Sequence, residues 1–277
     1  MPDSAAPPAP PAPPIASNKP HTLTGDIRTH ENFHSQFLER DHTLIVFRPP
    51  GYDADAARRY PVLYLHDGQN IFDQATSVGQ EWGVDETALG LITAGQIAPL
   101  IIVGIYNTGE HRIDEYTPTV DSEKKHGGKA DQYGRMLIEE IKPFIDRDYR
   151  TLPDALNTGL GGSSLGGLLT MHLGIRHSGV FSRLAALSPS VWWDERVIVR
   201  EVNALQGRLP LKIWLDAGTQ EGADVIADAR ALRDALITKG WVVGQDLSYI
   251  EAEGAQHNEA SWASRVDSVL KFLFPVA

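Results

Sequence analysis

Short apolar runs alternate with longer segments of helical periodicity along most of the chain. Residues 60–68 (YPVLYLHDG) and 100–107 (LIIVGIYN) are nearly continuous apolar runs closed by turns, as expected of strands buried on both faces. Residues 40–52 alternate polar and apolar side chains and end in Pro-Pro-Gly-Tyr, which predicts an antiparallel strand near a sheet edge. Further buried strands are predicted within residues 157–162, 182–190, 211–219 and 247–254.

Three segments place apolar side chains at the 3.6-residue spacing of helices that bury one face. The stripe over residues 133–145 contains Pro143, which is expected to kink or end the helix because proline has no N–H. The other two stripes cover residues 225–236 and 262–273. Strands that alternate with helices of this length indicate an α/β protein, with a mostly parallel central sheet covered by helices on both faces. A single domain over residues 21–277 is predicted.

Residues 1–20 have a different composition from the rest of the chain, because most of them are Pro or Ala. Such a segment favours extended conformations and predicts a disordered tail or linker outside the core. It contains no apolar stretch behind a basic one, so it does not predict an intact signal peptide. The remnant of an exported form and a cytoplasmic protein with a Pro-rich extension both stay open, and with them the compartment.

Charge and cysteine content narrow the classes of function. The chain has 25 basic and 36 acidic residues and a net charge of −11, which disfavours binding to nucleic acid or to a membrane surface. The absence of cysteine excludes a thiol nucleophile, thiolate metal sites and disulfides. His66-Asp67 has no second group of ligands at suitable spacing, so no metal and no other cofactor is expected. A small-molecule substrate is the expected partner, and the oligomeric state is left open.

Residues 162–166 (GSSLG) fit the pattern G-x-S-x-G with Ser164 at the centre. A nucleophilic serine lies on a tight turn between a strand and a helix, where side chains two residues to either side would collide. A short apolar strand precedes this segment and an apolar helix follows, so the N–H of Leu165 is expected to face a developing oxyanion. A phosphate-binding loop is the alternative, but it needs Lys followed by Ser or Thr, and Leu168-Leu169 stand there. Ser164 is the predicted nucleophile.

A base and an acid should follow, since a serine triad on this type of fold runs in the order Ser, Asp or Glu, His. His257 lies after the last predicted strand and before the C-terminal helix, which makes it the predicted base. Three carboxylates compete for the acid: Asp216, Glu221 and Asp224. Asp216 is still within a predicted strand, and Asp224 is placed to cap the next helix. Position favours Glu221, with Asp224 as the second candidate.

Several longer motifs resemble one family. They are YPVLYLHDGQNIFD (60–73), EYTP (115–118), EIKPFIDRDYR (140–150), GGSSLGG (161–167), LSPSVWW (187–193), GTQE (218–221) and HNEASW (257–262). From about residue 25 to the C-terminus the chain is similar to the Putative esterase family of α/β-hydrolases, which includes enterochelin esterases, feruloyl and acetyl-xylan esterases, and mycolyltransferases. The resemblance implies the α/β-hydrolase fold. It also implies that Glu221 is the triad acid, that His257 is the base, and that Gln69 supplies a second oxyanion N–H beside Leu165.

Aromatic and basic residues on the loops that follow strands are candidates for substrate binding. They are Trp82, Arg112, Trp192 and Trp193. Packing at the rim of the sheet is an equally good explanation for the Trp192-Trp193 pair.

The sequence therefore predicts a serine esterase that hydrolyses carboxylic esters through an acyl-enzyme on Ser164, with a feruloyl, acetyl-sugar or siderophore ester as substrate. Two alternatives stay open. An acyltransferase would use the same acyl-enzyme, and a carbohydrate-binding module would use the aromatic residues without turnover.

Overall fold

The computed structural model describes residues 19–123 and 125–276, and its centre is a sheet of eight strands in the order β1-β2-β4-β3-β5-β6-β7-β8. β1 pairs with β2 and β2 with β4 in antiparallel fashion, and the remaining neighbours pair in parallel. The strands are β1 (Asp26–Phe33), β2 (His42–Arg48), β3 (Val62–His66), β4 (Ile101–Ile105), β5 (Thr158–Ser163), β6 (Arg183–Leu187), β7 (Lys212–Gly218) and β8 (Leu247–Ala252).

The predicted strands are all present, and the sheet has one strand more than predicted. The additional strand is β1, which pairs with β2 at the edge of the sheet. Its residues are half-buried or exposed along its whole length. An edge strand of this kind buries neither face well, so the sequence DIRTHENF carries no strong apolar alternation to reveal it.

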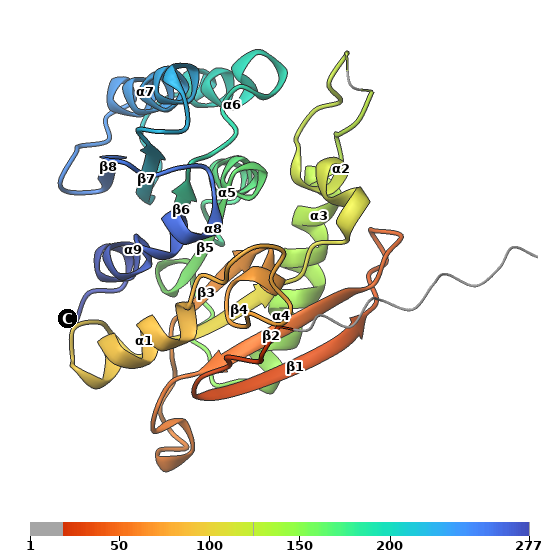
Figure 1. Cartoon of the computed structure of the whole chain (residues 1–277), viewed down its shortest axis with the longest axis vertical. Helices are drawn as coiled ribbons and strands as arrows, with labels where there is room; N and C mark the ends of the chain where they lie inside the picture. Colours follow the sequence, from red (N-terminus) through yellow and green to blue (C-terminus); the bar gives the residue numbers. More distant parts are fainter. Residues whose placement is uncertain (1–18, 124, 277) are drawn as a thin grey trace, which may run out of the picture.

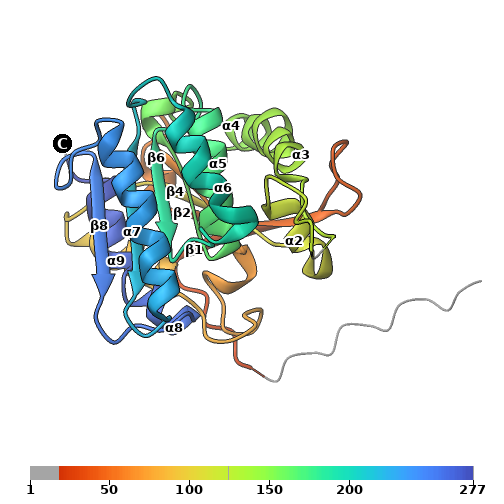
Figure 2. The same cartoon turned by 90° about the horizontal axis from the view of Figure 1, so that it is seen from above.

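Helices cover both faces of the sheet, as predicted, and Figures 1 and 2 show α1 and α9 on one side and α3 to α7 on the other. The first face carries α1 (Val84–Thr93), α8 (Glu259–Ala263) and α9 (Val266–Leu273). The second carries α2 (Arg112–Tyr116), α3 (Ala130–Arg135), α4 (Lys142–Asp148), α5 (Leu165–Arg176), α6 (Trp193–Ala204) and α7 (Ala223–Thr238). Short 3-10 turns complete the chain: η1 (Tyr52–Ala54), η2 (Gly68–Asn70), η3 (Gly109–His111) and η5 (Ala155–Asn157).

Each face of the sheet has its own hydrophobic core. In β3, Val62 and Tyr64 belong to the core under the larger group of helices, whereas Leu63 and Leu65 belong to the core under α1 and α9. Successive side chains of a strand point to opposite faces, so the continuous apolar run of β3 fills both cores. This is the α/β-hydrolase fold in a single domain.

The helix that contains Pro143 continues through it. A π-helical segment, η4 (Met136–Ile141), joins α3 to α4, and Pro143 lies in the first turn of α4. Proline cannot donate to the carbonyl four residues earlier, and its ring crowds that carbonyl. The wider turn just before Pro143 is where the chain accommodates it, so the helix does not end there, which was one of the two expected outcomes.

The N-terminal segment meets the fold close to the loops that carry the site. Most of the predicted tail, residues 1–18, lies outside the described residues. Lys19 Nζ donates to the carbonyls of Ser77 (2.9 Å) and Gly79 (2.8 Å), and His21 Nδ1 lies 2.7 Å from an Asp73 carboxylate oxygen. In the part of the chain that the structure describes, no helix has the length and apolar character needed to cross a membrane.

Candidate active site

Ser164 lies on the turn between β5 and α5, at the carboxyl edge of the sheet. Its φ of 57° and ψ of −123° are strained values for a residue that has a side chain. A Cβ on Gly162 would lie 3.1 Å from the Gly166 carbonyl carbon and 3.1 Å from His66 Cβ. The two glycines of the motif therefore lie where strand, helix and His66 approach closely, and a side chain at either position would force its neighbours to shift. The strand, turn and helix predicted around Ser164 are confirmed.

Three loops bring Ser164, His257 and Glu221 into contact. His257 Nε2 lies 3.0 Å from Ser164 Oγ, and His257 Nδ1 lies 2.7 Å from Glu221 Oε2. The side chain of Glu221 is fully buried, whereas the side chain of His257 is 42% exposed. With Nδ1–H donating to the carboxylate, Nε2 is left as the acceptor for the serine hydroxyl. The contacts have the geometry of a serine triad, and the catalytic roles of its members stay a prediction.

The other two carboxylate candidates lie elsewhere. Asp216 is fully buried within β7, where Arg265 Nε donates to its Oδ2 over 2.9 Å. Asp224 is exposed in the first turn of α7, and the N-cap of that helix is Gly222, contrary to our expectation for Asp224. Of the three, Glu221 is the carboxylate that reaches His257.

The surroundings of Glu221 favour its ionised form. Burial raises the pKa of this carboxyl group, but hydrogen bonds from His257, Ser188 and the N–H of Gly218 outweigh burial, so its pKa is lowered overall. Ser188 Oγ donates to Glu221 Oε1 over 2.6 Å, and Gly218 N donates to the same oxygen over 2.7 Å. A carboxylate that accepts several hydrogen bonds stays charged and orients the imidazole beside it.

Backbone contacts tie the acid loop to the base loop. Gln220 N donates to the carbonyl of Ala255 over 2.9 Å, two residues before His257. A Cβ on Gly218 would lie 2.3 Å from that same carbonyl oxygen and 2.7 Å from Glu221 Oε1. A glycine at this position thus allows the loops of Glu221 and His257 to touch.

Behind Glu221 lies a buried polar network that the sequence did not reveal. Ser188 Oγ accepts from Trp262 Nε1 (3.0 Å) and Arg265 Nη2 (3.1 Å), and Arg265 pairs with Asp216. An arginine inside the apolar stripe of the C-terminal helical segment was the one local signal for this network. A charge on an apolar helix face needs a buried partner, but the pattern does not say which carboxylate it is.

The two backbone groups predicted to bind the oxyanion lie at turns that follow strands of the sheet. Leu165 is the first residue of α5, and Gln69 lies in η2 after β3. Among the described residues, neither N–H donates to a backbone carbonyl outside its own helix. A Cβ on Gly68 would lie 2.6 Å from the Gly104 carbonyl carbon in β4, so η2 packs directly on the backbone of the sheet. N–H groups on turns that pack against the sheet suit an oxyanion hole, and that role stays a prediction.

A cavity of about 320 Å³ opens at Ser164 and His257, and most of the other residues that line it are polar. Arg112, a predicted substrate-binding residue, lines it and forms a two-pronged ion pair with Asp67, over 2.7 Å and 2.8 Å. Asn107 Nδ2 donates to the same carboxylate over 2.7 Å. Arg112 is thus held in place by its partner before any substrate binds.

The three tryptophans predicted to bind substrate do not line this cavity. Trp82 is 5% exposed and packs against Trp262, and Trp193 is 1% exposed with its Nε1 donating to the Thr119 carbonyl. Trp192 is 46% exposed beside Trp193. Tryptophans on the loops near the site can pack in the core or lie at the surface. A motif such as LSPSVWW does not show which of its two tryptophans is buried.

His66 lies directly beneath the serine turn as a buried, neutral side chain. Burial lowers its pKa to about 3, and its Nδ1 lies 3.1 Å from the Tyr133 hydroxyl. A neutral imidazole with one hydroxyl neighbour fits a packing role. Over residues 19–123 and 125–276, no cluster of His, Asp and Glu has the composition of a metal site.

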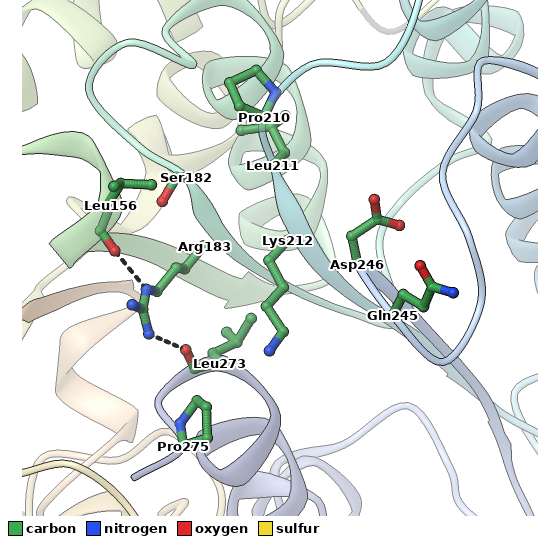
Figure 3. Close-up of a pocket in the computed structure, with 10 residues that line it drawn as sticks. All are labelled: Leu156, Ser182, Arg183, Pro210, Leu211, Lys212, Gln245, Asp246, Leu273 and Pro275. Atoms are coloured by element: carbon green, nitrogen blue, oxygen red, sulfur yellow. Dashed lines mark hydrogen bonds between the residues drawn. The ribbon is translucent and has the colours of Figure 1, made fainter. Parts of the chain in front are cut away.

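A second cavity, also of about 320 Å³, lies at the amino ends of β6 and β7 (Figure 3). Arg183 lines it and donates to the carbonyls of Leu156 and Leu273, and Lys212 extends into it from the neighbouring strand. In the described part of the chain, its lining contains no histidine, and its one carboxylate, Asp246, pairs with Arg208, so it lacks the serine–histidine–carboxylate arrangement found at Ser164.

Comparison with known proteins identifies the family of the chain. The model of the Putative esterase family matches residues 35–273. The ferri-bacillibactin esterase BesA of Bacillus subtilis is 31% identical over 58% of this chain and 60% of its own length. An endo-1,4-beta-xylanase/feruloyl esterase of Xylanibacter ruminicola is 26% identical over 87% of this chain, which spans 30% of that longer protein.

Among solved structures, the BES protein from Bacillus cereus has a TM-score of 0.73 at 23% identity, over 94% of this chain and 98% of its own. That likeness extends to the whole α/β fold. The family match covers nearly the whole domain described above, including all of the loops that meet at Ser164. The chain therefore belongs to the Putative esterase family and is a carboxylic ester hydrolase.

Proposed function

We propose that the chain hydrolyses small-molecule carboxylic esters through an acyl-enzyme on Ser164. The observation that carries the proposal is the unbroken series of contacts from Glu221 through His257 to Ser164. A serine hydroxyl is a weak nucleophile unless a base takes its proton, and the base needs a partner that fixes its ring. The strained backbone of Ser164 keeps the hydroxyl exposed at the cavity.

The reaction proceeds in two steps. His257 Nε2 takes the Ser164 proton as Oγ attacks the ester carbonyl, and the N–H groups of Gln69 and Leu165 bind the resulting oxyanion. Glu221 stabilises the imidazolium, which then protonates the departing alcohol. Water, deprotonated by His257, attacks the acyl-enzyme, and the proton returns to Ser164 Oγ as the acid leaves.

The relatives suggest which esters to try first. Their names specify a siderophore esterase and a feruloyl esterase. The cavity at Ser164 is lined by Asn70, Asn107, Arg112 and Glu259, so its walls offer hydrogen bonds and charge besides apolar contact. Feruloyl esters, acetylated sugars and siderophore esters are the candidate substrates, because each has polar groups around the ester bond.

The test is labelling with a fluorophosphonate together with turnover of a short-acyl chromogenic ester. Wild type should carry the label on the peptide with Ser164, and Ser164→Ala should lose both label and turnover. Ser163→Ala is the matched control, since it removes the neighbouring hydroxyl and should still be labelled. Wild-type turnover by folded Ser164→Ala would refute the assignment. Binding of oligosaccharides without label or turnover in wild type would favour a binding module.

A second assay separates hydrolysis from acyl transfer. The products are analysed in the presence of competing alcohols, since both reactions begin from the same acyl-enzyme. Free acid as the main product supports the hydrolase. A new ester as the main product would show that an alcohol is preferred to water.

A further inference from the structure

Ser188, directly after β6, is held in an unusual backbone conformation. It is 1% exposed, and its φ of 42° lies in the left-handed region that residues with side chains rarely adopt. Its N–H donates to Asp216 Oδ1 over 3.0 Å and to the Asp216 carbonyl over 3.1 Å. Strain of this kind persists only where the surrounding contacts enforce it, which indicates that the Ser188 side chain must point in one particular direction.

The direction of the Ser188 hydroxyl is determined by its neighbours. A serine hydroxyl has one proton to donate and two lone pairs to accept with. Trp262 Nε1 and Arg265 Nη2 are donors only, so they occupy the two lone pairs. The single proton is left for Glu221 Oε1, 2.6 Å away. No other arrangement satisfies all four groups.

The donor Arg265 is itself held by a buried ion pair. Its Nε lies 2.9 Å from Asp216 Oδ2 and its Nη2 lies 3.1 Å from Asp216 Oδ1, with both side chains nearly inaccessible. Trp214 Nε1 donates to the same carboxylate over 2.7 Å. A buried ion pair is on average no more stabilising than apolar packing of equal volume, so stability alone does not explain this pair.

Trp262 connects the same network to the base. Its ring meets the His257 ring edge-on, with centroids 5.0 Å apart and an interplanar angle of 84°, while its Nε1 donates to Ser188. The Ser188 hydroxyl therefore contacts both Glu221 and Trp262, the residue that packs against His257.

We propose that Ser188 is a positioning residue of the triad, which orients the Glu221 carboxylate through a hydrogen bond whose direction is set by Trp262 and by the buried Asp216–Arg265 pair. The inference rests on the proposed function, because it gives Ser188 a role only if Glu221 and His257 act in catalysis. Ser188 acts through Glu221 and does not itself reach the substrate.

If Ser188 orients Glu221, its replacement should shift the pH dependence of kcat/KM in one direction. A mutation that only loosened the structure would shift it in the opposite direction. The charged or titratable groups around the Glu221 carboxylate are His257 in front and, behind Ser188, Arg265 and Asp216. Loss of the Ser188 donor makes the carboxylate more basic, so the Glu221–His257 pair binds a proton more readily. The acidic limb of kcat/KM then moves to higher pH. If the mutation instead separated Glu221 from His257, the imidazolium would lose its partner and the limb would move to lower pH.

The experiment compares Ser188→Ala with Ser182→Ala. Ser182 is the matched control, since it flanks the other end of β6 and is 6% exposed. We expect Ser188→Ala to lower kcat by about 10- to 100-fold with KM changed less than about twofold. We expect its acidic limb to rise by about 0.5 to 1 pH unit. Ser182→Ala should match wild type in both respects.

A double-mutant cycle with Glu221→Gln then tests whether Ser188 acts through Glu221. Adding Ser188→Ala to Glu221→Gln should cost less than about threefold further, because the carboxylate that Ser188 orients is already gone. Equal losses from Ser188→Ala in both backgrounds would overturn the inference. So would an unchanged kcat or an acidic limb that moves to lower pH.

Two further variants keep the result interpretable. If Ser188→Ala does not fold, Ser188→Gly carries the same test, since glycine accepts the positive φ at this position. Ser164→Ala separates the two proposals. Activity lost in Ser164→Ala but unaffected in Ser188→Ala refutes the role of Ser188 alone, whereas activity retained in Ser164→Ala refutes the proposed function.

Discussion

The two ends of the parallel strands carry cavities of similar volume, about 320 Å³ each, and both are lined by charged residues. At the carboxyl end, charges meet opposite charges or hydrogen-bond partners, as Arg112 meets Asp67 and Glu221 meets His257. At the amino end, Arg183 and Lys212 stand opposite each other on neighbouring strands; among the described residues Arg183 donates only to backbone carbonyls, and Lys212 Nζ lies 4.4 Å from the centre of the Phe272 ring. Burial lowers the pKa of both, and Arg183 lowers that of Lys212 further.

The difference between these two cavities shows what identifies a catalytic site. Size and charge are common to both. The carboxyl end adds a strained serine, a base with its acid, and turns held against the sheet by glycines such as Gly68. These features orient reactive groups in advance, which is where an enzyme's binding energy is best used.

The largest effect is expected for Glu221→Gln. Without the carboxylate the imidazolium loses its stabilising partner, and kcat should fall roughly 10³- to 10⁴-fold while the fold is retained. Steady-state kinetics with the chromogenic ester would measure it. Asp224→Asn is the matched control and should change kcat less than about twofold, because Asp224 is exposed on α7. The reverse ranking would make Asp224 the acid.

The next effect concerns the contact between the acid and base loops. Gly218→Ala places a Cβ against the Ala255 carbonyl, so the loops of Glu221 and His257 must separate. We expect the free energy of unfolding to fall by about 1–3 kcal/mol and kcat by roughly 10- to 100-fold. Denaturation and kinetics would be compared with Gly207→Ala, where no atom lies within 4 Å of the new Cβ. Equal behaviour of the two variants would contradict the tight contact.

Stability should depend on pH through the buried His66. Its pKa of about 3 lies below the ordinary value of 6.5, so unfolding takes up a proton between these limits and stability is lost as pH falls through them. Between pH 7 and pH 5 the loss from this group should be about 2 kcal/mol. His66→Asn, which keeps a polar group near the position of Nδ1, should show a pH 7-to-5 difference smaller by that amount in denaturant unfolding. An identical difference in wild type and variant would argue against a neutral, buried His66.

The smallest effect belongs to the amino-end cavity. Lys212→Met removes one of two cations that face each other, and the free energy of unfolding should rise by about 0.3–0.5 kcal/mol with kcat/KM unchanged. Lys271→Met is the counterpart, since Lys271 pairs with Asp267 over 2.9 Å and its loss should lower stability by a similar amount. Both changes in the free energy of unfolding should become smaller in about 0.5 M salt, because salt screens the charges. A large loss of activity in Lys212→Met would break the contrast between the two ends.

Local patterns predicted most of the fold. β3 and β4 are recognisable as apolar runs because both of their faces are buried. The strand, turn and helix around Ser164 are recognisable from glycines a few residues apart. β1 was not predicted because a half-exposed edge strand has no continuous apolar run. The helix does not end at Pro143, which was one of the two expected outcomes, since a π turn can absorb a proline that a regular helix cannot.

Local sequence patterns were enough to assign the class of fold, the position of Ser164 on its turn and the small set of residues from which a base and an acid could come. These depend on constraints within a few neighbouring residues. The three-dimensional arrangement was needed to show that Glu221 is the carboxylate that reaches His257, 36 residues away, and that Ser188 and Arg265, 77 residues apart, share one hydrogen bond. It also decided that Trp193 packs in the core while Trp192 is exposed. Such pairings depend on how strands and loops are arranged in space, and composition and periodicity along a chain do not record that arrangement.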